Sequence, residues 1–430
     1  MTALRKSLAS LALTLPFTVL AQAPAAPAEP AAAPPAPPPP PVVQVYGTLN
    51  VNLHYTEASG AAPGEDNVSG RFVISPDSSN VGVRGTLALS DAVSAVYQCE
   101  IGANIDGEAL ASPCNRNSRV GLTGMFGTLA YGNWDTPFKS AHYGTKADDP
   151  FGNTDVFGQQ GLMGSPGFGV KTGSINNAAP PAAGLAGFDT RGGNSLLYWS
   201  PKFVGLGFRL QWGVDEFRSA EGTVDPMFLG VSANFDQGPL SVYGTVEYRE
   251  DFRGLGAIDA ANDSDRASKD LAWRVGAGYE LPLPMGALTL MGMVEQLTYN
   301  QDNAPATGDP DAPALKDYSR FAWLLGAKFR AGNHEFRARY SQALDPDITA
   351  ADGDALPANV EDDLGAQHLA VGYAYHLAKS TQVYGYYTQI MNDDFAQYSF
   401  GVAGASRVTG TNTPVGSDPV AVGLGIRHAF

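Results

Sequence analysis

The strongest constraint on the fold is that the chain consists of short alternating segments and lacks a long apolar one. After residue 41, segments of about ten residues carry apolar side chains at every second position, with small or polar side chains between them. Beyond the N-terminal leader, the sequence never supplies the roughly 20 consecutive apolar residues that a membrane-spanning helix needs. Because lipid cannot satisfy exposed backbone groups, only helices and closed barrels span membranes. The chain is therefore predicted to be soluble or to cross a membrane as a closed β-barrel.

The polar positions of these segments favour the barrel. In residues 273–280, bulky apolar residues alternate with glycines, Arg274 and Glu280, and residues 321–330 and 335–341 repeat the arrangement. A face that carries Arg and Glu would be costly to bury in a packed core. The same face costs little when it lines a water-filled lumen. The pattern thus predicts strands with one face toward lipid and the other toward water.

The connections between these segments have two lengths. The short ones are 90–91, 123–127, 236–239, 281–286, 330–333 and 378–380, and the long ones are 57–70, 105–117, 135–193, 215–227, 250–271, 301–319, 343–366 and 392–419. Short turns on one side and long loops on the other are typical of outer-membrane barrels, in which the number of strands is even. Residues 42–430 are therefore predicted to be all-β, a 16-stranded antiparallel transmembrane β-barrel with short periplasmic turns and long outer loops.

The N-terminus has the pattern of an export signal. Residues 5–6 are basic, and residues 8–20 form a mostly apolar stretch. Cleavage after Ala21 fits the small-residue pattern of such signals, whereas cleavage after Ala23 would leave a proline next to the cut. Residues 1–21 are therefore predicted to be a signal peptide.

A Pro/Ala-rich segment follows, at residues 22–41, and it ends in five consecutive prolines. Proline fixes φ and favours an extended polyproline II rod, so the segment is predicted to be a semi-rigid periplasmic linker. Two interpretations stay open. The linker is either a passive spacer or a rod that reaches the peptidoglycan of the cell wall.

Composition and motifs argue against several functions. The formal net charge of −16 argues against a nucleic-acid partner, since binding phosphates requires clustered Lys and Arg. Neither an H-E-x-x-H nor a G-x-S-x-G motif occurs, so the chain is not expected to be an enzyme or to hold a cofactor. The outer loops are rich in aspartate, but without the spacing of a twelve-residue calcium loop. Loose Ca²⁺ or Mg²⁺ bridging to lipopolysaccharide and a solvated acidic rim are both compatible with that composition.

The two cysteines, Cys99 and Cys114, flank one predicted loop. An exported chain matures in an oxidising setting, where a disulfide across that loop is possible. Because disulfide geometry is demanding, a bond and two free thiols both remain open. The pair offers too few ligands for a metal site.

Several motifs in order give the chain a family resemblance. They are the opening VYGTL at 45–49, SNVGVRG at 79–85, YQCE at 97–100, NRNSRVGL at 115–122, FGTLAYG at 126–132 and the terminal GIRHAF at 425–430. With these motifs the chain resembles the general diffusion porins of the Gram-negative outer membrane, particularly the trimeric porins of β-proteobacteria, over residues 42–430. The resemblance implies a homotrimer in contact with lipopolysaccharide and outer-membrane lipid. Asn80 and Asn133 stand where the family has arginine, so the family's ion preference is not carried over.

The resemblance also implies a constriction. The connection 135–193 occupies the place of the family's third loop, which folds into the barrel, and its many glycines permit tight folding. The acidic face of this loop is expected to consist of Asp135, Asp148, Asp149 and Asp155, and the basic wall opposite of Arg84, Arg116 and Arg119. Such an arrangement creates a transverse field that favours small, well-hydrated solutes. The alternative is that these are ordinary solvated charges. Under the constriction hypothesis, neutralising Asp148 and Asp149 shifts the reversal potential toward anions.

The leading functional hypothesis is passive diffusion of small hydrophilic solutes and ions through a water-filled barrel, which 16 strands are wide enough to form. A substrate-selective outer-membrane channel is the first alternative, and saturable block by one solute would distinguish it. A wall-tethering or adhesive barrel is the second, and it would conduct little after reconstitution. A barrel lipase or protease would need a nucleophile–histidine pair at the membrane edge, and the sequence shows none.

Overall fold

The computed structural model describes most of residues 42–430. Within that range the described residues exclude 106, 108–111, 153–156, 168–173, 176–186, 215–225, 252–267, 302–314, 351–354, 356–361 and 401–413. The predicted signal peptide and Pro/Ala-rich linker lie outside the described residues, so both stay predictions. No helix of the described part is long and apolar enough to cross a membrane.

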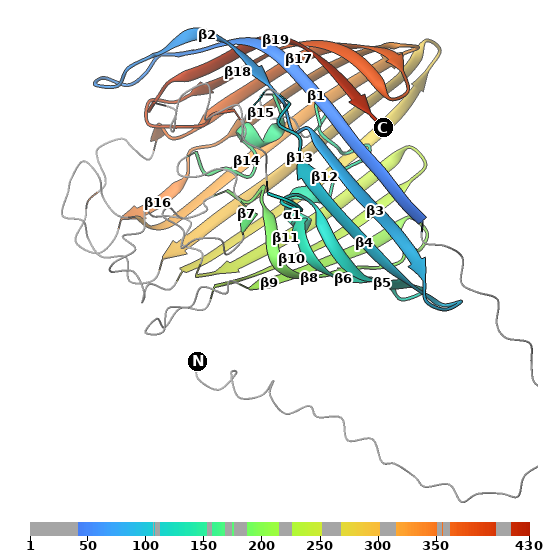
Figure 1. The fold of residues 1–430 in the computed structure, drawn as a ribbon. Coiled ribbons are helices and arrows are strands. Elements are labelled where there is room, and N and C mark those ends of the chain that lie inside the picture. Colours follow the sequence, from blue (N-terminus) through green and yellow to red (C-terminus); the bar gives the residue numbers. More distant parts are fainter. Residues whose placement is uncertain are drawn as a thin grey trace, which may run out of the picture. The chain divides into compact units, whose positions relative to one another are not determined.

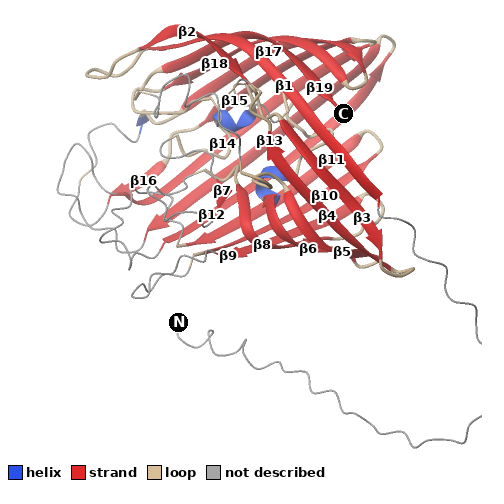
Figure 2. Ribbon diagram, viewed as in Figure 1, coloured by secondary structure: helices blue, strands red, loops and turns tan. Residues whose placement is uncertain are grey.

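Strands make up nearly all of the described regular structure (Figures 1 and 2). In the first half they are β1 (Val42–Ser59), β2 (Val68–Ser75), β3 (Asn80–Ala88), β4 (Val93–Gly102), β5 (Ser118–Gly124), β6 (Gly127–Asp135), β7 (Ser174–Ile175), β8 (Arg191–Trp199) and β9 (Leu206–Val214). In the second half they are β10 (Met227–Gln237), β11 (Leu240–Glu250), β12 (Ser268–Leu283), β13 (Gly286–Gln301), β14 (Leu315–Ala331), β15 (His334–Ala343), β16 (Asp347–Ala350), β17 (Ala366–Ala378), β18 (Thr381–Asn392) and β19 (Asp418–Ala429). A short helix, α1 (Pro137–Ser140), and a 3₁₀ turn, η1 (Gln159–Gly161), lie between β6 and β8.

The sheet closes on itself, because β1 pairs antiparallel with β19 from Thr48↔Ala429 to Ser59↔Asp418. The two short strands β2 and β3 pair with successive parts of β1, and β15 and β16 pair with successive parts of β14, so each couple forms one wall strand. β7 is a two-residue parallel addition to β8. Counted in this way, the described residues form a closed antiparallel barrel of 16 strands, which confirms the predicted fold class.

The two faces of the wall differ as the alternation predicts. On β12, Val275 is 47% exposed on the outside, whereas its neighbour Arg274 is fully buried on the inside. On β19, Leu424 is 72% exposed, and on β15, Phe336 is 52% exposed next to the largely buried Arg337. A side-chain period of two therefore places apolar groups toward lipid and charged groups toward the lumen.

The second wall strand is interrupted where the sequence did not predict it. Residues 76–79 leave the sheet between β2 and β3, and Asp77 and Ser78 adopt positive φ values of 38° and 60°. The segment bends into the lumen, where Asn50 Nδ2 donates to Asp77 Oδ2 at 2.8 Å and Asn50 N donates to Ser79 Oγ at 2.8 Å. The first long connection is consequently 60–67, shorter than the predicted 57–70.

The segment between β6 and β8, residues 136–190, folds into the barrel. Figure 2 shows its short helices inside the ring of strands. Its apolar residues pack on lumen-facing side chains of the wall: Phe138 and Phe188 join Tyr299 and Tyr318 in one cluster, and Met163 joins another. The lumen therefore contains a packed region built by this loop as well as open space. The expected inward fold of the third loop is confirmed.

Candidate pore and constriction

The base of the inward loop is closed by Asp135, the last residue of β6. Its carboxylate lies 3.0 Å from Arg191 Nη2 at the start of β8 and 3.3 Å from Lys139 Nζ of α1. Asn117 Nδ2 donates to the same carboxylate at 2.9 Å. Asp135 is buried, and its carboxylate joins the two ends of loop 136–190 to the segment before β5.

Three charged wall residues hold the middle of the loop. Arg274 on β12 donates through Nε to Glu295 Oε2 on β13 at 2.8 Å, and Arg320 on β14 donates to Glu295 Oε1 at 2.9 Å. All three side chains are fully buried. Glu295 also accepts a hydrogen bond from the backbone N–H of Gly164 at 2.7 Å, and Arg320 donates to the carbonyl oxygen of Leu162 at 3.3 Å. Arg274, which the alternation predicts to face water, is thus covered by the loop and paired, together with Glu295 and Arg320.

The returning part of the loop is held by Arg249 of β11. Its guanidinium donates to the carbonyl oxygen of Gly187 at 2.9 Å and to Thr190 Oγ1 at 2.8 Å. Nε donates to Glu247 Oε1 at 2.8 Å, and the guanidinium carbon lies 4.1 Å from the centroid of the Phe188 ring. The hydrogen bonds that this arginine would make to lumen water are therefore made to loop atoms instead.

The tip of the loop is fixed by Asp149. Its Oδ2 accepts a hydrogen bond from Arg339 Nη1 of β15 at 2.6 Å, and both side chains are buried. The backbone N–H groups of Phe151 and Gln159 donate to the same carboxylate at 3.2 and 2.8 Å. Burial raises the pKa of the Asp149 carboxyl, although Arg339 and these backbone donors act in the opposite direction. Asp149 lies at the pore, but its charge is paired.

The other acids of the predicted loop face have different surroundings. Asp148 accepts from the backbone N–H of Gly144 at 2.8 Å and lies 2.8 Å from His142 Nδ1, so it stabilises the turn that it belongs to. Asp155 lies outside the described residues.

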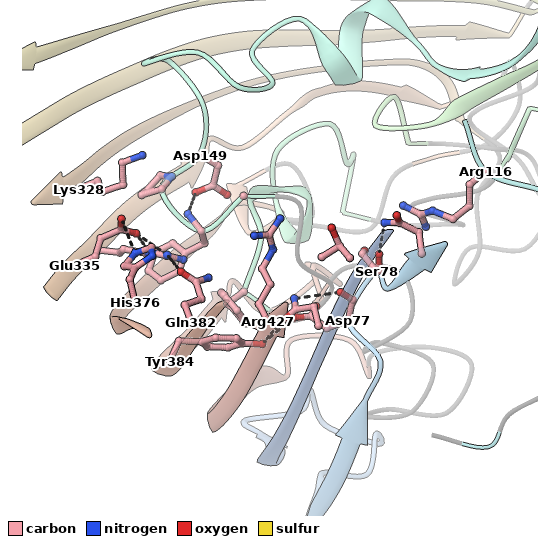
Figure 3. A pocket seen from close by; sticks show the side chains of 18 residues that line it. Asp77, Ser78, Arg116, Asp149, Lys328, Glu335, His376, Gln382, Tyr384 and Arg427 are labelled. Carbon is pink, nitrogen blue, oxygen red and sulfur yellow. Dashed lines mark hydrogen bonds and ion pairs between the residues drawn. The ribbon is translucent and has the colours of Figure 1, made fainter. Parts of the chain in front are cut away.

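A cavity of about 420 Å³ lies between the loop tip and the wall. Its charged and polar lining includes Asp77, Arg116, Asp149, Lys328, Glu335, Arg337, His376, Gln382 and Arg427. Figure 3 shows these side chains, which come from the segment between β2 and β3, the segment before β5, the loop tip and strands of the second half of the chain, β14, β15, β17, β18 and β19. This cavity is the candidate constriction among the described residues.

Cations outnumber acids in this lining, with Arg116, Lys328, Arg337 and Arg427 against Asp77, Asp149 and Glu335. Glu335 pairs with Arg337 at 2.5 Å and lies 3.2 Å from His376 Nε2, and Asp149 is neutralised by an arginine behind it. Lys328 and Arg427 have no ion pair among the described residues. Arg427 was missed in the sequence, although it shares lumen parity with Gly425 in the last strand; Glu295 and Arg320 were missed in the same way.

The predicted basic wall is divided among three places. Arg84 on β3 is exposed, and its guanidinium lies 4.5 Å from the Tyr46 ring centroid, away from the cavity lining. Arg116 lines the cavity and pairs with Glu100 at 2.9 Å. Arg119 does not line it and is described below. Opposite the loop tip, the basic groups come from the second half of the chain instead.

Cys99 of β4 and Cys114 of the loop that follows it form a disulfide. The bond spans 15 residues and ties the loop 103–117 to the barrel wall. Among the described residues, no group of three or more His, Cys, Asp or Glu side chains is arranged to hold a metal ion.

Comparison with known families settles the class of the barrel. Residues 9–394 match the family described as Gram-negative porin. The chain belongs to this family. It is a channel of the Gram-negative outer membrane for passive diffusion of small solutes, and its relatives are porins, not enzymes.

Individual relatives are similar over most of their length. Outer membrane porin protein 32 of Delftia acidovorans is 25% identical over 394 residues, which cover 90% of this chain and 94% of the relative. Major outer membrane protein P.IA of Neisseria meningitidis serogroup B is 26% identical over 387 residues, which cover 81% and 92%. Among solved structures, an anion-selective porin from Comamonas acidovorans superposes with a TM-score of 0.66 at 22% identity, covering 91% of this chain and 100% of that chain. That structure shows the same fold.

Proposed function

We propose that this porin prefers anions, and that the preference arises at the cavity between the loop tip and strands β14 to β19. The observation that carries the proposal is the positive charge of Lys328 and Arg427, which form no ion pair among the described residues, whereas the lining acids Asp149 and Glu335 already have cationic partners. Asp77, the third acid of the lining, accepts hydrogen bonds from Asn50 and Tyr384. In a narrow passage with low-dielectric walls, such charge raises the local concentration of counter-ions. A structural neighbour is named as anion-selective, which agrees with the proposal.

The test is the reversal potential of single channels in a planar bilayer under a KCl gradient. For the wild-type protein we expect a potential that reports a higher permeability for chloride than for potassium. Arg427→Gln and Lys328→Gln should each lower the chloride-to-potassium permeability ratio, because each removes one charge from the passage. Arg71→Gln is the matched control, since Arg71 is exposed on β2 and lines neither of the two cavities described. A cation-preferring wild type, or an unchanged ratio in Arg427→Gln, refutes the proposal.

We also propose that the chain works as a homotrimer. An outer membrane protein of Vibrio cholerae with the same fold is known in a trimer form. Around the β1–β19 closure, Leu53, Phe72 and Leu424 are 50%, 75% and 72% exposed, which suits a subunit contact as well as lipid. Chemical cross-linking in outer membranes should give a trimer band, and monomers alone would contradict the proposal.

The linker at residues 22–41 is proposed to lie in the periplasm, either as a spacer or in contact with peptidoglycan. Deleting residues 24–40 tests the second role, since unchanged co-sedimentation with peptidoglycan would exclude it. Contacts with lipopolysaccharide and loosely bound Ca²⁺ or Mg²⁺ at the outer loops stay predictions.

A further inference from the structure

A second cavity, of about 470 Å³, lies inside the barrel on the other side of the inward loop. Its wall comes from β5, β6, β8, β9 and β10, and its cover is the segment that follows α1. Ser200, Lys202 and Gly205 place it next to the turn between β8 and β9, at the end of the barrel that carries the short turns. It shares no lining residue with the cavity at the loop tip.

Three cations line this second cavity without an acidic partner among the described residues. They are Arg119, Lys202 and Arg209. Arg209 Nη1 donates to the carbonyl oxygen of Ser140 at 3.1 Å and to its Oγ at 3.2 Å, both of which are neutral. None of the three forms an ion pair among the described residues, although the charge of Lys202 also acts on Asp236.

The acid of the second cavity is already engaged. Asp236 Oδ1 lies 2.8 Å from Lys146 Nζ and accepts a hydrogen bond from Ser241 Oγ at 2.5 Å. The pair of Asp236 and Lys146 is neutral together, so the three remaining cations determine the sign of the potential.

Arg119 shows the imbalance most clearly. Its guanidinium carbon lies 4.8 Å from the ring centroid of Trp134 and 4.1 Å from that of Trp199. Its Nε and Nη1 atoms are buried and have no hydrogen-bond partner among the described residues. Stacking on indole rings stabilises a cation, but it does not replace the lost hydrogen bonds. A bound anion nearby would compensate this desolvated charge.

Part of the remaining surface of the cavity is aromatic. Trp134 and Trp199 meet edge to face with centroids 5.0 Å apart, and Tyr143 also lines the cavity. Trp199 and Arg209 are directly paired across β8 and β9, so an aromatic face and a guanidinium stand side by side on the lumen wall. Ring faces beside unpaired cations suit a ligand that has both an aromatic ring and a negative charge.

We propose that this second cavity is a binding site for small aromatic carboxylates, with the carboxylate at Arg209 and Lys202 and the ring against Trp199 and Tyr143. Arg119 contributes positive potential from its place between the indoles. The site is independent of the ion preference proposed for the cavity at the loop tip, since the two have no residue in common. Such a site would retain aromatic anions on their way through the channel.

The test is a titration of the purified, folded protein in detergent, followed by tryptophan fluorescence. Benzoate is the probe, because Trp134 and Trp199 line the cavity and report on its occupancy. We expect a saturable change in emission. Acetate supplies the charge without the ring, benzamide supplies a ring without the charge, and both should give weaker or non-saturable changes. Equal binding of acetate or of benzamide would overturn the proposal.

Variants distinguish binding at this site from unspecific partition of benzoate into the detergent. Arg209→Gln and Lys202→Gln should each weaken benzoate binding, by about tenfold where a charge-assisted hydrogen bond is lost. Lys202 is exposed in a turn, so its variant tests the site even if Arg209→Gln does not fold. Arg71 lies on β2 and does not line this cavity, so Arg71→Gln should bind benzoate as the wild type does. An absent saturable change, or the same affinity in Lys202→Gln and Arg209→Gln as in the wild type, would refute the site.

Discussion

At the residue scale, the role of a charged lumen side chain depends on whether the inward loop buries it. Arg249, Arg274, Arg320 and Arg339 are fully buried beneath the inward loop and act as its attachment points. Arg427 has the same strand parity but lies in the open cavity. A buried charge persists only when it is paired, whereas an exposed lumen charge acts on passing ions. The same residue type is therefore structural on one part of the wall and functional on another.

Asp393 gives a prediction at this scale, because partial burial and the neighbouring charges of Asp345 and Asp363 raise its pKa. A carboxyl with a raised folded-state pKa destabilises the folded protein when it ionises, so its unfavourable contribution grows as pH rises from its ordinary value of 3.8. Asp393→Asn should therefore raise the thermal unfolding temperature at pH 7, and the gain should shrink as the pH falls toward 3.8. Unfolding scans at several pH values check this. A gain that is independent of pH would contradict the electrostatic explanation.

Strand parity predicted which residues face inward, but not which of them are covered. Arg274, Arg337 and Arg339 were placed on the lumen side from the alternation alone. Their partners could not be predicted. Asp149 and Arg339 are 190 positions apart, and Asp149 belongs to a loop whose sequence has no periodicity. The expected opposition of an acidic loop to Arg84 and Arg119 rested on family resemblance. In the structure these two arginines stack on aromatic rings instead.

At the element scale, the inward loop is a folded part of the barrel. Phe138 and Phe188 pack against the wall, and the side chain of Glu295 accepts a hydrogen bond from the backbone N–H of Gly164. These contacts involve both ends and the middle of the loop. Together with the buried ion pairs of Glu295 and Asp149, they hold the loop against the wall.

Glu295→Gln tests that dependence. The change removes the ion pair of the buried Arg320 and leaves the buried Arg274 with Asp189 alone, and the loss of one partner of a buried pair costs about 3–5 kcal/mol. The free energy of unfolding should fall by that order, and the single-channel conductance should rise because the loop loosens. Glu280→Gln is the control on β12, where the side chain is exposed. Reduced stability with unchanged conductance would show that the loop keeps its place without this cluster.

The disulfide gives a second prediction at this scale. Cys99→Ser together with Cys114→Ser opens a loop of 15 residues, and the chain-entropy estimate for such a loop is about 3 kcal/mol. Stability toward denaturant should fall by that order, as measured by unfolding of the refolded barrel. The ion preference should not change, because neither cysteine lines the pore cavity. A shifted reversal potential in the double variant would assign the loop 103–117 a role in selectivity.

The sequence predicted the elements better than their interruptions. Alternation and turn composition gave the strands and the even count, because a period of two is a local property. The inward bend at residues 76–79 and the turn at 200–205 were missed. Asp77 and Ser78 take positive φ values within a polar run that also suits a loop, so only their contacts with Asn50 reveal the bend.

At the scale of the whole molecule, charge is divided between the outside and the passage. The formal net charge of the chain is −16, yet the lining of the pore cavity contains Arg116, Lys328, Arg337 and Arg427. Ion preference therefore does not follow from the total charge, since the narrow passage dominates the potential that a permeating ion meets. Closure of β1 on β19 makes the wall continuous, and the loop inside it determines how much of the lumen is open.

The central claim is that the described lumen is a water-filled passage for ions and small solutes. Single-channel recording of the wild-type protein in planar bilayers tests it most directly. We predict discrete conductance steps that increase in proportion to KCl concentration, with a reversal potential that favours chloride in a salt gradient. A protein that inserts as a folded barrel but gives no steps would contradict the account.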